Sequence, residues 1–257
     1  MKNRSVKIIC LIAIMSVLLS IGGCYGYFPI KIPFKIPGVI QGSGNIVTES
    51  RSVSNFNRIS MSWVGNLIIT QGEEESLTVK AENNIMQYII TEVRDDTLYL
   101  GFDTEKYKII LPGKPVEYNL KLKNIVGLNV SGSGNIESDS IETDYIDFNL
   151  SGSTNVNIRM LKAERLNIKI SGSSNVGLIG KVNEQDIKIS GSGRYNAGDL
   201  FSEKVNLKVS GSGKIAIWAT ESLDVNISGS GTVEYYGNPT IRSSISGSGK
   251  INSLGEK

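Results

Sequence analysis

Residues 128–135 read Leu128-Asn129-Val130-Ser131-Gly132-Ser133-Gly134-Asn135, and this stretch returns with small changes along the second half of the chain. Before each Ser-Gly-Ser stands an apolar–polar–apolar triplet such as Ile168-Lys169-Ile170, which is the period of a strand with one buried face. A repeat of about 20 residues predicts a solenoid, in which each turn buries its inner face against its neighbours. The copies open 18 to 20 residues apart, at Ser131, Ser151, Ser171, Ser190, Ser210, Ser228 and Ser246.

The constant order of strand and corner favours parallel stacking. An antiparallel barrel or sandwich, the main alternative, would show Asn-Gly or Asp-Gly hairpins between strands of unlike sequence. Earlier copies of the repeat lie at residues 41–46 and 59–67, and the segment between Ser62 and Ser131 has room for three more turns with insertions. We therefore expect an all-β, single-domain parallel β-helix, right-handed and of roughly ten rungs.

The Ser-Gly-Ser-Gly-Asn segment has two interpretations. Alternate glycines predict a corner where the chain needs positive φ or where backbones approach closely. Asn135, Asn155 and Asn175 would then form a hydrogen-bonded ladder between turns, with Asn45 and Asn66 in the equivalent register. The other interpretation is a flat polar stripe that binds a glycan. We favour the corner, because every turn needs one whatever its function.

The composition of the 257-residue chain excludes several kinds of chemistry. It contains no histidine, which excludes a Ser-His-Asp nucleophile and a His-ligated zinc site. The two cysteines, Cys10 and Cys24, both lie near the start, so no disulfide or cysteine metal site is expected within the repeats. We expect no metal and no cofactor.

The first residues resemble an export signal. Lys2, Arg4 and Lys7 precede an apolar stretch that is too short for a spanning helix, and Gly22-Gly23-Cys24 follows it. This pattern resembles a bacterial lipoprotein signal, in which Cys24 is acylated and becomes the first residue of the mature chain. The expected organisation is a signal peptide (1–23), an acylated Cys24 with a Pro-rich tether (24–40), and a β-helical domain (41–257).

Processing would change the net charge of the chain and determine its location. Removing residues 1–23 deletes three basic residues from a total of 27 and none of the 25 acidic ones, which leaves 24 against 25. A near-neutral surface argues against a nucleic-acid partner. The expected location is extracytoplasmic, on a membrane through the lipid at Cys24. Tyr25 rather than Asp after the cysteine resembles the outer-membrane default, if the cell has two membranes.

Acidic and aromatic side chains supply the remaining candidate sites. Most acidic residues recur about ten positions after a Ser-Gly-Ser, near Lys or Arg, which is typical of a solvated, charged turn. A polysaccharide-acting enzyme would instead need carboxylates that converge in one groove. Trp218, Tyr235 and Tyr236 could stack on sugar rings or could cap the open end of the core. The candidate binding surface is therefore Trp218, Tyr235, Tyr236, Asn135, Asn155 and Asn175.

Other segments carry a family resemblance that covers roughly residues 45–252. They include Phe56-Asn57-Arg58-Ile59, Leu77-Thr78-Val79-Lys80-Ala81 and Val233-Glu234-Tyr235-Tyr236-Gly237-Asn238-Pro239, beside the Gly-Ser-Gly-Asn-Ile copies. Together they resemble the head GIN domain family, described as "putative auto-transporter adhesins". The resemblance implies a bacterial extracytoplasmic β-helical domain, and it supplies no catalytic motif.

These observations predict a noncatalytic cell-envelope lipoprotein that acts as an adhesin or binding module. Its partners would be the membrane, through Cys24, and a glycan or a surface protein. The alternative is a structural rod that associates with itself. A polysaccharide-acting carboxylate enzyme is the least favoured hypothesis.

Overall fold

The computed structural model describes residues 38–103 and 109–257. The signal peptide, Cys24 and nearly all of the tether therefore lie outside the described residues. One continuous sheet of 17 strands coils through the described part, and a separate pair joins β1 (Val39–Gln41) to β8 (Ile109–Leu111). The helix in this part of the chain is α2 (Asn83–Met86). The expected all-β, parallel β-helix is confirmed.

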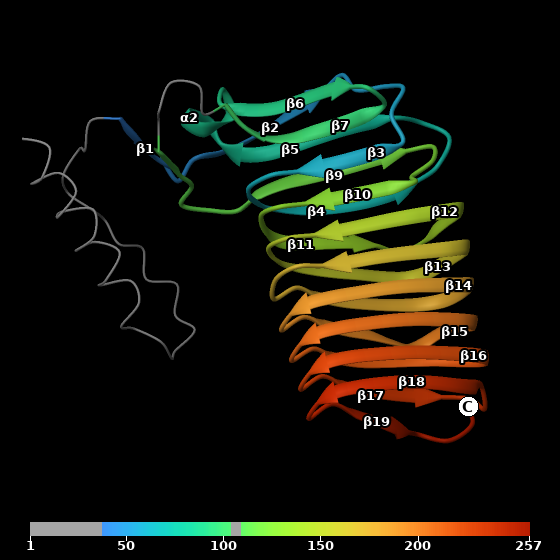
Figure 1. Cartoon of the computed structure of the whole chain (residues 1–257). Helices are drawn as coiled ribbons and strands as arrows, with labels where there is room; N and C mark the ends of the chain where they lie inside the picture. Colours follow the sequence, from blue (N-terminus) through green and yellow to red (C-terminus); the bar gives the residue numbers. More distant parts are fainter. Residues whose placement is uncertain (1–37, 104–108) are drawn as a thin grey trace, which may run out of the picture. The chain divides into compact units, whose positions relative to one another are not determined.

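The repeats form a regular parallel coil, visible in Figure 1 as stacked turns from green to red. Equivalent residues of successive copies lie side by side: Asn135 pairs with Asn155, and Asn155 pairs with Asn175. The strands of this coil are β10 (Gly127–Val130), β11 (Ser133–Ser138), β12 (Ile141–Leu150), β13 (Ser153–Ile170), β14 (Asn175–Gly191), β15 (Arg194–Gly211), β16 (Lys214–Gly229), β17 (Thr232–Tyr236), β18 (Thr240–Gly247) and β19 (Lys250–Ser253).

The core consists of columns of apolar side chains that run along the coil axis. The apolar positions of each strand face inward, so the same position of every turn stacks on the last one. One column contains six residues that are each no more than 2% exposed: Ile136, Val156, Val176, Tyr195, Ile215 and Val233. Burial of one such aliphatic side chain stabilises the fold by about 1.5–3 kcal/mol, and stacking repeats that gain at every turn.

Close backbone approach explains the first glycine of each corner. A Cβ added to Gly152 would lie 1.9 Å from the carbonyl oxygen of Gly132, one turn earlier. The same clash recurs at Gly172 and Gly211, at 2.4 and 2.5 Å from the oxygens above them. Any side chain at this position would therefore push neighbouring turns apart, as the sequence predicted for this corner.

The number of turns is smaller than expected. The structure contains about six turns of coil, not ten. Most of the chain between Ser62 and Ser131 instead folds, together with β2 and β3, into a cap in which β5 pairs antiparallel with both β2 and β9, and β6 with β7. The cap strands are β2 (Ile46–Arg51), β3 (Arg58–Met61), β4 (Val64–Gln71), β5 (Ser76–Glu82), β6 (Ile89–Arg94), β7 (Thr97–Phe102) and β9 (Val116–Leu122).

The two earlier repeat copies lie in different parts of the structure. In the copy at residues 59–67, β3 and β4 stack directly on β10 and β11, with Asn66 opposite Asn135. The copy at residues 41–46 does not join the coil, so the expected ladder position of Asn45 is wrong. Ser43 is instead held by Asn83 and Asn84, the first two residues of α2, and Gly44 donates to Glu82. Residues 41–46 therefore contact the cap and do not add a turn to the coil.

The two ends of the coil differ. At the N-terminal end, α2 adds the buried side chains Ile85 and Met86 to the core. At the C-terminal end, β18 pairs with β16 on one side, and all eight of its residues are exposed. Ile241 and Ile245 are 39% and 44% exposed, although they occupy the positions of fully buried residues one turn earlier. The last layer of the core is therefore open.

Candidate binding edge

The coil has two long edges, and the asparagine ladder runs beside the first. This serine–glycine edge consists of the Ser-Gly-Ser corners. Asn155 donates its side-chain amide to the side-chain oxygen of Asn135 at 2.9 Å, and Asn175 donates in the same way to Asn155 at 3.0 Å. Asn66 extends the ladder, since it accepts from Asn135 at 3.3 Å. The ladder predicted from the sequence is confirmed for these four residues.

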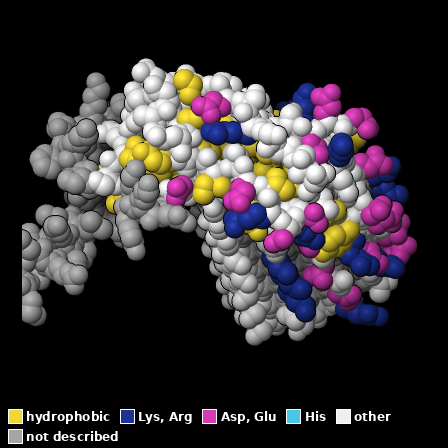
Figure 2. All heavy atoms as spheres, turned by 90° about the horizontal axis from the view of Figure 1, so that it is seen from above, with side chains coloured by type: hydrophobic (Ala, Val, Ile, Leu, Met, Phe, Trp, Pro, Cys, Tyr) yellow, Lys and Arg dark blue, Asp and Glu magenta, His cyan; other side chains and the backbone are white. Residues whose placement is uncertain are grey.

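The opposite edge, here called the charged edge, consists of residues 142–145, 162–165, 181–184 and 201–204. Figure 2 shows basic and acidic side chains gathered together along one side of the molecule. Ion pairs here join neighbouring turns: Lys162 contacts Glu142 at 2.5 Å and Arg165 contacts Glu184 at 2.9 Å. The nearby carboxylate of Glu142 raises the pKa of Lys162. The expectation of a solvated turn with mixed charges agrees with this arrangement.

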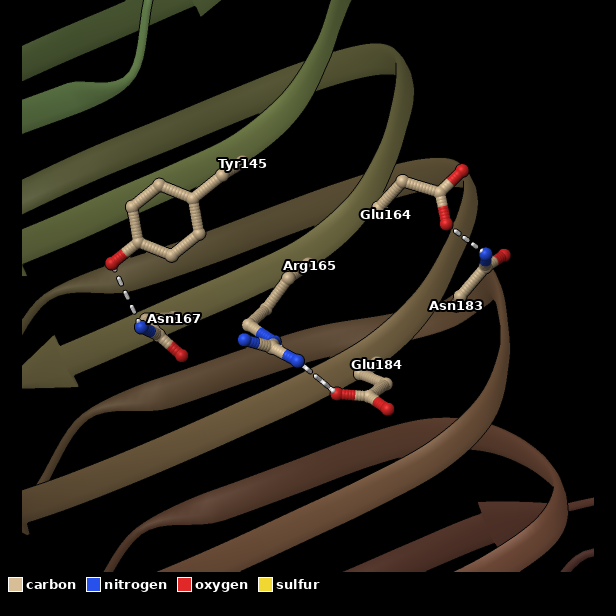
Figure 3. A network of polar contacts seen from close by, with 6 residues as sticks. All are labelled: Tyr145, Glu164, Arg165, Asn167, Asn183 and Glu184. Carbon is tan, nitrogen blue, oxygen red and sulfur yellow. Dashed lines mark hydrogen bonds and ion pairs between the residues drawn. The ribbon is translucent and has the colours of Figure 1, made fainter.

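A groove of about 660 Å³ lies on the charged edge, between the side chains of successive turns. Figure 3 shows polar contacts that run along it: Glu164 accepts from Asn183, and Asn167 donates to the hydroxyl of Tyr145 at 3.0 Å. Burial, followed by a hydrogen bond with Asp147, raises the pKa of Tyr145. The groove is lined by Asn124, Val126, Glu142, Thr143, Asp144, Tyr145, Lys162, Ala163, Glu164, Lys181, Asn183 and Glu203.

Below the groove the edge becomes aromatic. Phe201, Trp218 and Tyr236 occupy the same position on three successive turns, and all three are half-buried. We call them the aromatic column. Phe201 and Trp218 meet edge to face with ring centroids 5.1 Å apart. The position continues upward to Lys181, whose ammonium lies 5.3 Å from the centre of the Phe201 ring.

The structure therefore separates the residues that the sequence grouped together. Trp218 and Tyr236 lie side by side on neighbouring turns. The asparagine ladder lies on the same face of the sheet, at the opposite ends of its strands. Tyr235 pairs with the buried Ile217 and packs against the core, so it does not join the aromatic column.

Sequence reasoning missed Phe201, Lys181, Asp199 and Lys257. Lys257 places its ammonium 4.7 Å from the centre of the Tyr236 ring and 5.4 Å from that of Trp218. It also forms an ion pair with Asp199. One signal was present: the repeat shortens from 20 to 18 residues after Ser210, which indicates that one turn overhangs the next at this edge.

Within residues 38–103 and 109–257, no group of three or more acidic, cysteine or histidine side chains is arranged to hold a metal ion. Among the same described residues, no helix has both the length and the apolar composition needed to cross a membrane.

The described strands form a parallel β-solenoid, which is the fold class of this chain. Residues 55–239 match the family described as "Putative auto-transporter adhesin, head GIN domain", and the chain belongs to this family. The resemblance noted from the sequence is thereby confirmed.

Solved structures agree with the family. The chain is 31% identical to a "putative adhesin" from Bacteroides fragilis, with a TM-score of 0.79 over 84% of this chain and 100% of that one. It is 26% identical to a "putative lipid binding protein" from Parabacteroides distasonis, with a TM-score of 0.70 over 84% and 99%. A "putative adhesin" from Parabacteroides merdae shares the fold at 22% identity, with a TM-score of 0.69 over 84% and 99%. No curated protein matches the sequence.

Proposed function

We propose that this chain is a noncatalytic lipoprotein of the cell envelope that binds a glycan along its aromatic column. The observation that supports this most is that Phe201, Trp218 and Tyr236 present partly exposed rings on three successive turns. Aromatic rings offer apolar contact area at low conformational cost, and a row of them matches a ligand with repeating units. Adhesin-like names among the family and its relatives support a binding role.

The charged edge supports binding over catalysis. Glycoside hydrolysis by carboxylates needs two such groups that flank one bond. Here Glu142, Glu184 and Asp139 each face a cation on an adjacent turn, namely Lys162, Arg165 and Arg159. These carboxylates contribute to solubility and to the joining of turns.

Binding and cleavage are tested together with full-length protein in detergent micelles. We expect retention on an array of envelope and host glycans and no new reducing ends in the same solutions. Trp218→Ala should lower the retention at least about tenfold, the effect of losing about 1.4 kcal/mol. Tyr99→Ala is the matched control, because Tyr99 is also half-buried under a cation, Arg94 at 4.5 Å, but lies in the N-terminal cap. Cleavage, or equal loss in both variants, would refute the proposal.

The anchor is a separate part of the proposal. Cys24 ends the apolar stretch of the leader, and we propose that it carries the lipid, with the outer membrane as destination in a cell with two membranes. Cys24→Ser should abolish labelling by a fatty-acid analogue and release the protein from membranes. Cys10→Ser, inside the apolar stretch, should leave both unchanged. Labelling that survives Cys24→Ser would contradict the anchor.

One observation favours a second role, self-association of the rod. Ile241 and Ile245 are exposed at the C-terminal end of the core, and no other strand of residues 38–103 and 109–257 pairs with the outer edge of β18. Such an edge pairs readily with another strand. A two-fold contact between C-terminal ends would cover both surfaces. Sedimentation of the micelle-bound protein at increasing concentration should then reveal a dimer that Ile245→Lys abolishes, while a monomer at every concentration would exclude this role.

A further inference from the structure

The lower end of the aromatic column surrounds a positive charge. The ammonium of Lys257 lies near the rings of Trp218 and Tyr236, donates to the carbonyl oxygen of Gly198 at 2.6 Å, and pairs with the carboxylate of Asp199. Each of these groups attracts a cation: two π faces, a carbonyl and a carboxylate. A combination of aromatic faces with acceptors is suited to an alkylammonium group and not to an anion.

The site results from the change in repeat length. The pairing of β15 with β16 is regular up to Ala197, and it resumes at Phe201, so residues 198–200 have no partners on β16. Tyr236, two turns below, reaches this overhang: a Cβ on Gly198 would lie 3.2 Å from its ring. The overhang thus brings Gly198 and Asp199 to rings that belong to the next two turns.

The last residues of the sequence deliver the ammonium that occupies the site. Leu254 donates to the carbonyl of Tyr235 at 2.8 Å, and Gly237 donates to the carbonyl of Gly255 at 2.9 Å. These two bonds fix the backbone beside β17, and Lys257 reaches the site from there. The side chain of Asp199 remains 63% exposed and that of Lys257 is 32% exposed, so solvent reaches the pair. A ligand could therefore replace Lys257 without unfolding the coil.

We propose that this is an ammonium subsite of the glycan-binding edge, that its ligand is an amino sugar, and that Lys257 occupies it when no ligand is bound. The inference rests on the proposed function, since the sugar ring would stack on the same aromatic column. The amine would take the place of the Lys257 ammonium between Asp199, the Gly198 carbonyl and the rings. A tethered lysine acts as a competitor at high effective concentration, so it weakens binding of every free amine.

The test compares three hexasaccharides that differ in one substituent: glucosamine, N-acetylglucosamine and glucose hexamers. Calorimetric titration uses full-length protein in micelles. Lys257→Ala should bind the glucosamine hexamer about tenfold or more tighter than the unaltered protein does, with no gain for the two neutral hexamers. Lys257→Arg keeps the charge and should behave like the unaltered protein. In the Lys257→Ala background, Asp199→Asn should weaken glucosamine binding about tenfold, the loss of one charge-assisted hydrogen bond.

The outcomes separate this inference from the function on which it rests. Equal gains for all three hexamers in Lys257→Ala would mean that Lys257 merely covers a neutral sugar site, which overturns the ammonium subsite and keeps the glycan function. No gain for any hexamer, with the urea midpoint of Lys257→Ala lowered, would make Lys257 a structural tie and also overturn the inference. No binding of any glycan by any variant would overturn both.

Discussion

The side-chain amide of Asn155 donates to the side-chain oxygen of Asn135, one turn earlier in the coil and 2.9 Å away. Asn155 also accepts from Asn175 on the following turn, so it links three turns outside the core. Each end of the ladder is exposed to water, yet the bonds repeat in register with the backbone. The ladder therefore adds side-chain bonds to the same turns that the backbone already joins.

The ladder predicts a modest and local effect on stability. Asn155→Ala removes both side-chain bonds and should lower the free energy of unfolding by about 1–3 kcal/mol, at roughly 0.5–1.5 kcal/mol for each bond. Asn157→Ala is the control, because Asn157 lies on the same strand, is equally exposed and stacks on Gly177 instead of another asparagine. Urea unfolding should show a lower midpoint for Asn155→Ala with an unchanged slope. Equal midpoints for the two variants would show that the ladder contributes nothing.

The glycine corner predicts a much larger effect. Gly152→Ala places a methyl group 1.9 Å from the Gly132 oxygen, so the two turns must separate and their backbone bonds must lengthen. We expect a loss of more than about 4 kcal/mol, a size reserved for strain or broken networks. Gly177→Ala is the matched control, since its nearest atoms would lie 3.7 Å away. It should change the free energy of unfolding by less than about 0.5 kcal/mol. A small effect of Gly152→Ala would contradict the close approach of the turns.

A buried polar network predicts a dependence on pH. Tyr195 is fully buried and donates to Gln185 at 2.5 Å, and Gln185 in turn donates to Ser202 at 2.5 Å. Burial raises the pKa of Tyr195 above its ordinary value of 10.0. The unfolded chain therefore loses the phenol proton at a lower pH than the folded chain does. The stability that depends on the neutral phenol is fully present below about pH 10 and declines as the pH rises further.

Tyr195→Phe isolates this contribution. The variant should be less stable than the unaltered protein at neutral pH, by about 1–3 kcal/mol, because the Gln185 oxygen loses its partner. Above pH 10.0 the gap between the two proteins should narrow, since the variant has no phenol to ionise at this position. Urea midpoints measured at neutral and strongly alkaline pH check this. A gap that stays constant or widens with pH would contradict the assigned shift.

The repeat period of the sequence predicted most of the fold. The apolar–polar alternation around Ser131 and its later copies predicted the strand faces, and the alternate glycines predicted corners with close backbones. Because similar short segments recur in one order, they also predicted parallel stacking and the register of the asparagines. The cap could not be predicted in this way. Residues 68–127 lack the repeat, and the antiparallel pairs of the cap depend on contacts between segments far apart in the chain.

The binding edge was predicted only in part. Trp218 and Tyr236 were visible as aromatic residues near the end of the repeats, and the 18-residue period places them in one column. Phe201 joins that column only because residues 198–200 are left without partners on β16, and a count of sequence positions places it out of register. Tyr235 differs from Tyr236 by one position, and strand alternation sends it to the core. Lys257 reaches Asp199 across 58 residues, a contact that no local pattern encodes.

The most direct test of the account is to observe the aromatic column while a glycan binds. The chain has two tryptophans, so the protein labelled with 5-fluorotryptophan gives two fluorine resonances. Trp63 lies in the N-terminal cap against Phe102, with ring centroids 5.3 Å apart, and serves as the internal control. Titration with the glucosamine, N-acetylglucosamine and glucose hexamers should shift the Trp218 resonance for at least one of them and leave Trp63 unchanged. A hexamer that binds by calorimetry but leaves the Trp218 resonance in place would contradict the central claim.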